Sequence, residues 1–471
     1  MRRIAHVATA ALVLMFSAKG WALGFVNFEQ GASGTGITES RTPLYDDPNT
    51  VFYNPAGMVE LPGFQFSLGA TAFMPTTHYK PNNQTPTTYT TWGFVQKEAD
   101  NFGNESDTIK KAFVSPHLYF TYLFKDYGVA IGFGTFSSCG MGTYWPKDFD
   151  GRYIISHTYL GALFNQPTVA VDIAKLAGFK DKLKLSVAAG YDLIYATASL
   201  GKVIDLRGAE FGIDPAQIPS RPEGTMTLDG SGFAHGYAFA VYAELPKLLS
   251  FGFSFHGGSH LKMTGDGKFT FTEAGQAALG GTSPPTIIPE KAKGTVELNF
   301  PHVINTGVAY LGVDRWKFIL DLEFALYKDR YKQIDITFDC YPDNCSLAPQ
   351  ALKTDYGTGG AVDFGIMWLM KDYLELRAGG GWTFSPIPAA TMDPALTDGH
   401  RITGSIGAGY IAKSWKVDLA YMFTMWKATK DNEVGAPEPI PDTTFHNPIG
   451  YANGEYTNIV NTLALSYGMK F

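Results

Sequence analysis

Apolar and polar residues alternate one by one over many segments of this chain, and this alternation limits the possible fold more than any other feature. Near the C-terminus, Leu463, Leu465 and Tyr467 share one face of an extended strand, while Thr462 and Ser466 occupy the other. Successive side chains of a strand point to opposite faces, so each such segment has one apolar and one polar side. A strand that separates lipid from a water-filled lumen requires this division.

A helical membrane protein is disfavoured. After residue 22, no continuous apolar stretch approaches the roughly 20 residues that a spanning helix needs. The chain is nevertheless 45% hydrophobic and only 17% charged, with 25 tyrosines and 34 phenylalanines. This composition suits many short strands with aromatic ends at a membrane surface. We therefore expect an all-β fold, a transmembrane antiparallel β-barrel.

The alternating segments number about fourteen, an even count that is typical of bacterial barrels. Short connections such as 125–126, 313–314 and 371–372 alternate with long polar ones, as periplasmic turns alternate with outer loops. A soluble β-sandwich or propeller is the competing fold, and this asymmetry weighs against it. The expected strands are 64–79, 113–124, 127–137, 156–174, 182–198, 227–244, 249–264, 293–312, 315–330, 357–370, 373–384, 401–413, 415–428 and 456–471.

The first 22 residues have the layout of a secretory signal peptide. Arg2 and Arg3 precede an apolar run over residues 7–16, and the small-residue exit Gly20-Trp21-Ala22 follows. Residues 23–63 contain several glycines and no alternation. Irregular backbone at membrane depth must be buried in protein or face water, so we expect this segment to be a plug, or hatch, inside the lumen. The barrel then comprises residues 64–471.

Several function classes are disfavoured. A net charge of −7 without a basic stripe argues against nucleic acid. The histidines lack metal-ligand spacing, and the glycines between residues 31 and 36 lack the context of a dinucleotide loop, so no metal or cofactor is expected. An outer-membrane lipase is the enzyme alternative, but no Gly-x-Ser-x-Gly motif supports it. Cys340 and Cys345 lie in a polar stretch, where an oxidising compartment permits a disulfide.

Four groups of residues together resemble the FadL/TodX family of outer-membrane transporters for long-chain fatty acids and aromatic hydrocarbons. They are Gly24-Phe25 with Glu29-Gln30-Gly31-Ala32, Asp46-Asp47-Pro48-Asn49 with Tyr53-Asn54-Pro55-Ala56-Gly57-Met58, Thr143-Tyr144-Trp145 with Gly151-Arg152-Tyr153, and Ser385-Pro386-Ile387-Pro388 with Met392-Asp393-Pro394 and Asp398. The resemblance runs from the mature N-terminus to Phe471 and is weakest in the loops. It implies a fourteen-stranded barrel in the outer membrane of a Gram-negative bacterium, a hatch, an apolar pocket and a kinked third strand with a side exit.

Each implied feature has a candidate here. Asn54, Pro55, Ala56 and Gly57 form the hatch motif, in which the Asn side chain can tie turn backbone and Pro fixes φ. Leu23, Gly24, Phe25 and Phe28 are the candidates for the ligand pocket and N-terminal gate, with packing filler as the alternative for Phe25. Gly132 and Gly134 are the candidates for the strand kink and lateral opening. Close packing of the plug is the alternative explanation for these two glycines.

Charged residues on the polar faces of strands are expected in the lumen. Glu375 and Arg377 could form a charge ladder with Asp321 and Glu323, and structural pairing is favoured over capture of a ligand carboxylate. Arg152 is grouped with these lumen charges, and it could instead anchor a loop or the hatch.

Passive transport of hydrophobic small molecules, with lateral exit to the bilayer, is the function that these features predict. A general porin or a structural outer-membrane protein is the alternative, because the barrel pattern alone permits either. The expected partners are a fatty acid or aromatic hydrocarbon, together with outer-membrane lipid and lipopolysaccharide. A plugged barrel that releases cargo sideways has no need of a second subunit, so a monomer is expected.

Overall fold

The structure is a computed structural model that describes residues 24–82, 88–91, 94–97, 104–205, 223–280, 289–328, 330–339, 350–431 and 452–471. The predicted signal peptide, Leu23 and the pair Cys340 and Cys345 lie outside these residues. The proposed disulfide therefore stays a prediction. Within the described part of the chain, no helix has both the length and the apolar character that crossing a membrane would require.

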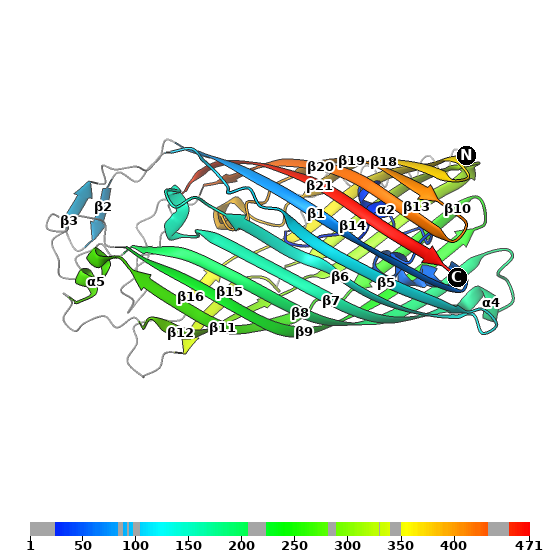
Figure 1. Cartoon of the computed structure of the whole chain (residues 1–471), viewed down its shortest axis with the longest axis horizontal. Coiled ribbons are helices and arrows are strands. Elements are labelled where there is room, and N and C mark those ends of the chain that lie inside the picture. The colour runs from blue at the N-terminus through cyan, green and yellow to red at the C-terminus, as the bar shows by residue number, and fades with distance from the viewer. Residues whose placement is uncertain are drawn as a thin grey trace.

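Strands form one closed antiparallel barrel, as predicted (Figure 1). Four positions around the ring hold two consecutive strands each, so eighteen strands fill fourteen positions. The ring is β1 (Phe64–Pro81), β5 (Phe113–Phe124), β6 (Val129–Tyr144), β7 (His157–Asp172), β8 (Lys184–Asp205), β9 (Glu223–Leu245), β10 (Leu249–His256) with β11 (His260–Phe271), β12 (Lys291–Asn299) with β13 (His302–Val313), β14 (Trp316–Leu326) with β15 (Gln333–Asp339), β16 (Gln350–Lys353) with β17 (Thr358–Lys371), β18 (Leu374–Phe384), β19 (Arg401–Ile411), β20 (Trp415–Lys430) and β21 (Gly454–Lys470).

The ring closes between the first and last strands. β1 pairs with β21 from Gln65 opposite Lys470 to Pro81 opposite Gly454, and its other edge pairs with β5. A short strand, β4 (Ser106–Asp107), adds to β1, and β2 (Thr88–Thr91) pairs with β3 (Phe94–Lys97) as a separate hairpin. Because both edges of every long strand find partners, the barrel leaves few unpaired backbone groups in the membrane.

The two faces of the strands divide as the alternation predicts. On β21, Leu463 and Leu465 are 47% and 55% exposed on the outside, whereas Thr462 and Ser466 are buried on the inside. The connections between strands also divide into two groups, as predicted from their lengths. Short connections such as the one between β5 and β6 gather at one end of the barrel, and long ones gather at the other (Figure 1).

Four short helices or turns outside the plug cover the ends of strands. They are η3 (Asp150–Tyr153), α4 (Ile173–Leu176), α5 (Glu273–Gly280) and η6 (Ala389–Thr391). The segment before β1 folds into α2 (Ala32–Thr35), α3 (Thr50–Tyr53) and η2 (Pro55–Glu60). These elements lie inside the barrel, nearer the end with the short turns (Figure 1). α2 packs against β19 to β21 and η2 packs against β7 to β9, so the segment crosses the lumen.

Candidate functional site

The hatch motif ties the plug to the barrel wall. Asn54 is fully buried, and its side-chain amide donates to the carbonyl oxygens of Thr42 (2.8 Å) and Val241 of β9 (3.0 Å). Its side-chain oxygen accepts from the backbone N–H of Ala56 at 3.2 Å, which caps η2. The Ala56 carbonyl in turn accepts from the hydroxyl of Ser186 on β8 at 2.7 Å. One side chain therefore links two parts of the plug to the wall.

Pro55 and Gly57 shape the same turn. Pro55 is the first residue of η2, a position where its missing N–H costs no helical hydrogen bond. A Cβ on Gly57 would lie 2.8 Å from the Cβ of Tyr45, so a larger residue would push these two parts of the plug apart.

Substitution of Asn54 by Ala should loosen the plug without removing the barrel. The carbonyls of Thr42 and Val241 would lose their donor inside the lumen. We expect the free energy of unfolding to fall by about 2–3 kcal/mol, since unsatisfied buried polar groups are costly. Thermal unfolding in detergent measures this, with Asn165→Ala on the outer face of β7 as the control. Equal midpoints for Asn54→Ala and the control would contradict this role.

Charge pairs provide a second set of plug contacts. Arg41 of the plug is fully buried and pairs with Asp46 and Asp47, and Lys317 of β14 reaches Asp46 at 2.9 Å. On the other side of the lumen, Lys184 of β8 lies 3.2 Å from Glu60, the last residue of η2. These pairs join the plug to β14 and β8.

The predicted lumen charges occupy three different settings and do not form one ladder. Arg377 pairs with Glu375 and lies 2.7 Å from Asp418, a buried group within the wall. Asp321 accepts the backbone N–H of Thr42 in the plug at 2.9 Å. Glu323 faces an internal cavity.

Arg152 requires a correction, because it does not belong with the lumen charges of β14 and β18. It lies on η3, in the long connection after β6, at the opposite end of the barrel from the short turns. Its guanidinium lies 2.9 Å from the Tyr153 hydroxyl and 3.5 Å from Glu223 at the start of β9. The second alternative, anchoring of a loop, matches this position.

The third barrel strand, β6, separates from β5 over part of its length. The two strands pair from Phe124 opposite Val129 to Leu118 opposite Thr135. No strand pairing joins residues 113–117 to residues 136–143, although the structure describes both stretches. The gap ends where the Ile109 N–H donates to the Tyr144 carbonyl at 2.8 Å. We call this gap, bounded at both ends by hydrogen bonds, the window.

A shift of register accompanies the window. Opposite β7, Phe136 pairs with Phe164 and Cys139 pairs with Ala162, so β6 contains one residue more than β7 between these pairs. Such an extra residue bends a strand and disrupts its ladder. The bend lies at residues 137–138, where β6 leaves β5.

This position corrects the predicted one. Gly132 and Gly134 lie in regularly paired parts of β6, before the bend. A Cβ on Gly132 would lie 2.3 Å from the sulfur of Met58. One on Gly134 would lie 2.9 Å from the Tyr119 ring of β5 and 3.1 Å from Val51 of the plug. Gly132 therefore makes room for the plug, which was the alternative explanation, and Gly134 makes room for both the plug and the Tyr119 ring.

The N-terminal segment, residues 24–28, lies against the bend from inside the barrel. Val26 forms an isolated antiparallel bridge with Cys139. The Asn27 N–H donates to the Ser138 carbonyl at 2.8 Å, and the Gly140 N–H donates to the Phe25 carbonyl at 3.1 Å. Backbone groups that β6 does not pair with β5 thus find partners in the N-terminal segment.

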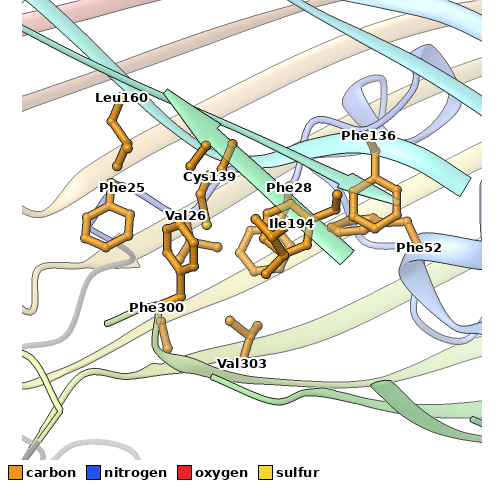
Figure 2. Packing of buried hydrophobic residues seen from close by; sticks show 14 of the residues in the cluster. Phe25, Val26, Phe28, Phe52, Phe136, Cys139, Leu160, Ile194, Phe300 and Val303 are labelled. Atoms are coloured by element: carbon orange, nitrogen blue, oxygen red, sulfur yellow. The ribbon is translucent and has the colours of Figure 1, made fainter. Parts of the chain in front are cut away.

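Phe25 inserts into a cage of aromatic side chains on the far wall. Its ring centroid lies 6.0 Å from Phe300, 5.4 Å from Tyr327 and 5.5 Å from Tyr331, and Phe25 is 1% exposed. Figure 2 shows these contacts continuing through Val26 and Phe28 to Phe52 and Phe136. Gly24 has φ of +60°, and a Cβ there would lie 2.7 Å from the Tyr327 hydroxyl oxygen.

A cavity of about 250 Å³ connects the lumen with the window. Its lining includes the plug residue Phe28 and the lumen-facing residues Thr424 and Asn458. It also includes Val114, which is 63% exposed on the outer face of β5, and Tyr159 on the outer face of β7. Residues of both barrel faces therefore line one continuous space.

Aromatic residues surround the outer mouth of the window. The Phe113 ring lies 6.4 Å from Tyr144 and 6.2 Å from Tyr159, and Tyr144 stacks on His157 at 5.5 Å. The Lys111 ammonium lies 3.2 Å from the centre of the Tyr144 ring. Aromatic and basic side chains of this kind favour the interface between lipid and water.

Sequence reasoning missed the bend at residues 137–138 and the aromatic cage. Pro301 and the pair Gly257-Gly258 interrupt expected strands, and they signalled the breaks beside the cage. Tyr327 and Tyr331 were assigned to a strand or a loop, and nothing in their spacing joins them to Phe25, about 300 residues earlier in the sequence.

Comparison with known proteins agrees with this geometry. The model of the family described as outer membrane protein transport protein (OMPP1/FadL/TodX) matches residues 13–471. A protein of Neisseria meningitidis serogroup B, described as an outer membrane protein, is 25% identical over 442 residues, which are 90% of each chain.

Solved structures share the fold. A Pseudomonas aeruginosa FadL homologue has a TM-score of 0.75 at 17% identity and covers 96% of this chain and 100% of its own. The Ralstonia pickettii toluene transporter TbuX has a TM-score of 0.65 at 16% identity, covering 95% of this chain and 99% of its own. The Pseudomonas putida toluene transporter TodX has a TM-score of 0.65 at 15% identity, covering 96% and 99%.

Proposed function

Because the chain belongs to the OMPP1/FadL/TodX family of outer membrane transport proteins, we propose that it lets long-chain fatty acids or aromatic hydrocarbons cross by passive diffusion. The protein is an outer-membrane β-barrel that transports hydrophobic compounds, and it is not an enzyme. We also propose a route through the barrel. Cargo would enter the lumen, pass the N-terminal segment and leave through the window into the bilayer.

The cavity at the window is the observation that supports this route most strongly. Thr424 and Asn458 line it from the lumen, and Val114 and Tyr159 line it from the outside. A paired barrel wall would separate these two sets of side chains. The aromatic mouth around Tyr144 suits the outer membrane surface, so cargo leaving there would meet lipid and not water.

The N-terminal segment supports a gate at the inner end of this route. Its backbone is hydrogen-bonded to the bend of β6, and its Phe25 ring fills the aromatic cage. We propose that an apolar ligand binds against the Phe25 ring, and that the segment then releases the bend. Leu23, the predicted first residue of the mature chain, precedes this segment and lies outside the described residues.

Such a route requires no energy source. A hydrocarbon chain gains roughly 0.8 kcal/mol per CH₂ on leaving water, so a 16-carbon tail favours the bilayer by about 12 kcal/mol. The barrier is the polar outer leaflet, and an apolar passage around it is sufficient for transport. Since the window opens directly toward lipid, we also propose that the protein acts as a monomer surrounded by outer-membrane lipid and lipopolysaccharide.

A general porin is the second candidate. A barrel of fourteen strand positions is wide enough to hold a water channel. In this protein, however, α2, α3 and η2 cross the lumen. Planar bilayers separate the two functions, because a porin passes a steady ion current and a plugged barrel does not.

Binding of radiolabelled cargo tests the proposal. The purified barrel in detergent is titrated with a long-chain fatty acid and with an alkylbenzene, beside a variant that lacks residues 24–28. We expect saturable binding of at least one cargo, weakened about tenfold by the deletion, which corresponds to about 1.4 kcal/mol. Phe25→Ala should act in the same direction, and Phe251→Ala on the lipid-facing side of β10 is the matched control. Absence of saturable binding of both cargos would overturn the proposal.

A further inference from the structure

A cationic patch lies on the outer wall of the barrel, at the break between β14 and β15. The sequence over residues 328–332 is Lys-Asp-Arg-Tyr-Lys, and the placement of its acid, Asp329, lies outside the described residues. Lys328 and Lys332 are exposed, and Arg330 is partly exposed. The tyrosines at this break face inward and form part of the aromatic cage. The break therefore places aromatic rings inside the barrel and cations outside it.

The patch begins where the apolar outer face of β14 ends. From Phe318 to Leu326, every second residue of β14 is apolar and faces outward. At about 3.3 Å per residue and a tilt of roughly 40°, this stretch rises about 20 Å across the membrane. β14 starts at a short turn, so its far end points toward the long connections of the outer surface (Figure 1). Lys328 and Arg330 therefore follow at the level of the outer-leaflet headgroups.

Arg330 faces a second hydrogen-bond donor. Its Nη1 lies 2.9 Å from Nε2 of His302. The other ring nitrogen of His302, Nδ1, accepts the Gly258 N–H at 2.8 Å. A neutral imidazole has only one acceptor nitrogen, so Nε2 carries the ring proton and cannot accept from Arg330. The two side chains therefore have one donor too many, and an anion in contact with both would satisfy it.

Acidic side chains do not compensate Arg330. Among the residues that the structure describes, no carboxylate forms an ion pair or a hydrogen bond with its guanidinium. Glu297 of β12, farther toward the outer end of the barrel, pairs with Lys262 at 3.0 Å. Asp335 lies opposite Glu297 and accepts from the side chain of Gln333 at 2.7 Å. These two acids therefore have partners of their own, and the guanidinium is available to an external anion.

We propose that the patch formed by Lys328, Arg330, Lys332 and His302 binds the phosphate groups of lipopolysaccharide in the outer leaflet. This site goes beyond the proposed function, because it lies on the outer wall at β14 and not at the window beside β6. The planar guanidinium suits phosphate oxygens, and Nε2 of His302 can donate to the same group. The apolar face that ends at Leu326 would contact the acyl chains of the same molecule. A free phosphate lacks these chains, so the lipid should bind more tightly.

Removal of the phosphates from the lipid tests this site. Lipid A, the phosphorylated membrane anchor of lipopolysaccharide, is titrated into the purified full chain in nonionic detergent, beside the same lipid stripped of both phosphates. Dissociation constants are measured by native mass spectrometry. We expect lipid A to bind about tenfold or more tightly than the stripped lipid. In the triple variant Lys328→Gln, Arg330→Gln and Lys332→Gln, the two lipids should bind about equally. Inorganic phosphate in about tenfold excess should not displace lipid A from the wild-type protein.

A second triple variant removes the same charge at the opposite end of the barrel. Lys125→Gln, Lys371→Gln and Lys413→Gln, all exposed at short turns, should retain the preference for lipid A. Heat-dependent mobility on gels verifies that each variant retains the folded barrel. Arg330→Gln alone should reduce the preference about threefold, and it provides the test if the triple variant does not fold.

Three results would overturn the proposal. They are equal binding of the two lipids by the wild-type protein, the same preference in the patch variants and in the short-turn variant, and displacement of lipid A by inorganic phosphate. The last result would show a site for free anions. Cargo binding and uptake measure the proposed function separately, so the failure of either claim leaves the other in place.

Discussion

A disulfide between Val26→Cys and the native Cys139 should reduce uptake of hydrophobic cargo about tenfold or more, equivalent to about 1.4 kcal/mol or more in a barrier. The hydrogen bonds from Asn27 to Ser138 and from Gly140 to Phe25 flank this residue pair. Val26 and Cys139 are therefore a non-hydrogen-bonded antiparallel pair, in which Cα atoms approach to about 4.5 Å, within disulfide range. The crosslink would hold the N-terminal segment on the bend of β6.

Reduction breaks this disulfide again, so the reduced protein serves as the control for the oxidised protein. Initial uptake rates are measured in cells with oxidised and reduced protein, in a background with Cys340→Ser and Cys345→Ser to prevent other crosslinks. Reduction should restore the rate, and oxidation of the background with Val26 intact should have no effect. Equal rates for oxidised and reduced Val26→Cys protein would show that cargo passes without displacement of the segment.

Deletion of Ser138 should also reduce uptake about tenfold or more. We expect this effect because the deletion closes the window, the proposed exit, and not because it changes the gate. The deletion removes the extra residue between the pairs of Phe136 and Cys139, so β6 can continue in register with β7. A regular β6 can extend its pairing toward β5 and close the window. Uptake by cells and binding by purified protein are measured in parallel.

The deletion should reduce uptake by cells but not binding by the purified protein. Cargo should still bind inside a barrel with a closed window, because the aromatic cage around Phe25 is unchanged. Ser138→Gly keeps the extra residue and should transport at the normal rate. Normal uptake by the deletion variant would mean that cargo leaves by another route.

The barrel could be predicted from sequence because its cause is local. A strand between lipid and lumen needs period-two alternation, and residues 462–471 display it without reference to any other segment. The count of fourteen followed, although the expected strands 249–264 and 293–312 are each broken into two, and two further strands, β15 and β16, lie in the expected loop 331–356. The breaks lie at Gly257, Pro301 and their neighbours, where backbone freedom or a missing N–H ends a ladder.

The site was harder to predict from the sequence, because its geometry depends on residues that lie far apart in the chain. The bend of β6 depends on which residues of β7 and of the N-terminal segment pair with it, and neither partner can be identified from β6 alone. Gly132 and Gly134 were the local signal for a kink, but glycine also occurs where a neighbour packs closely, and Met58 and Val51 fill that space. Arg152 was misplaced for a similar reason, since a loop can fold over the barrel end.

Uptake and conductance, measured together, test whether this plugged barrel transports hydrophobic compounds. The wild-type chain is expressed in a bacterial host without transporters of this kind, and initial uptake of a radiolabelled alkylbenzene and of a long-chain fatty acid is recorded. The same protein is inserted into planar bilayers. We expect uptake of at least one cargo well above that of the empty host, with no steady ion current. Uptake equal to that of the empty host, or a steady current through the wild-type barrel, would contradict it.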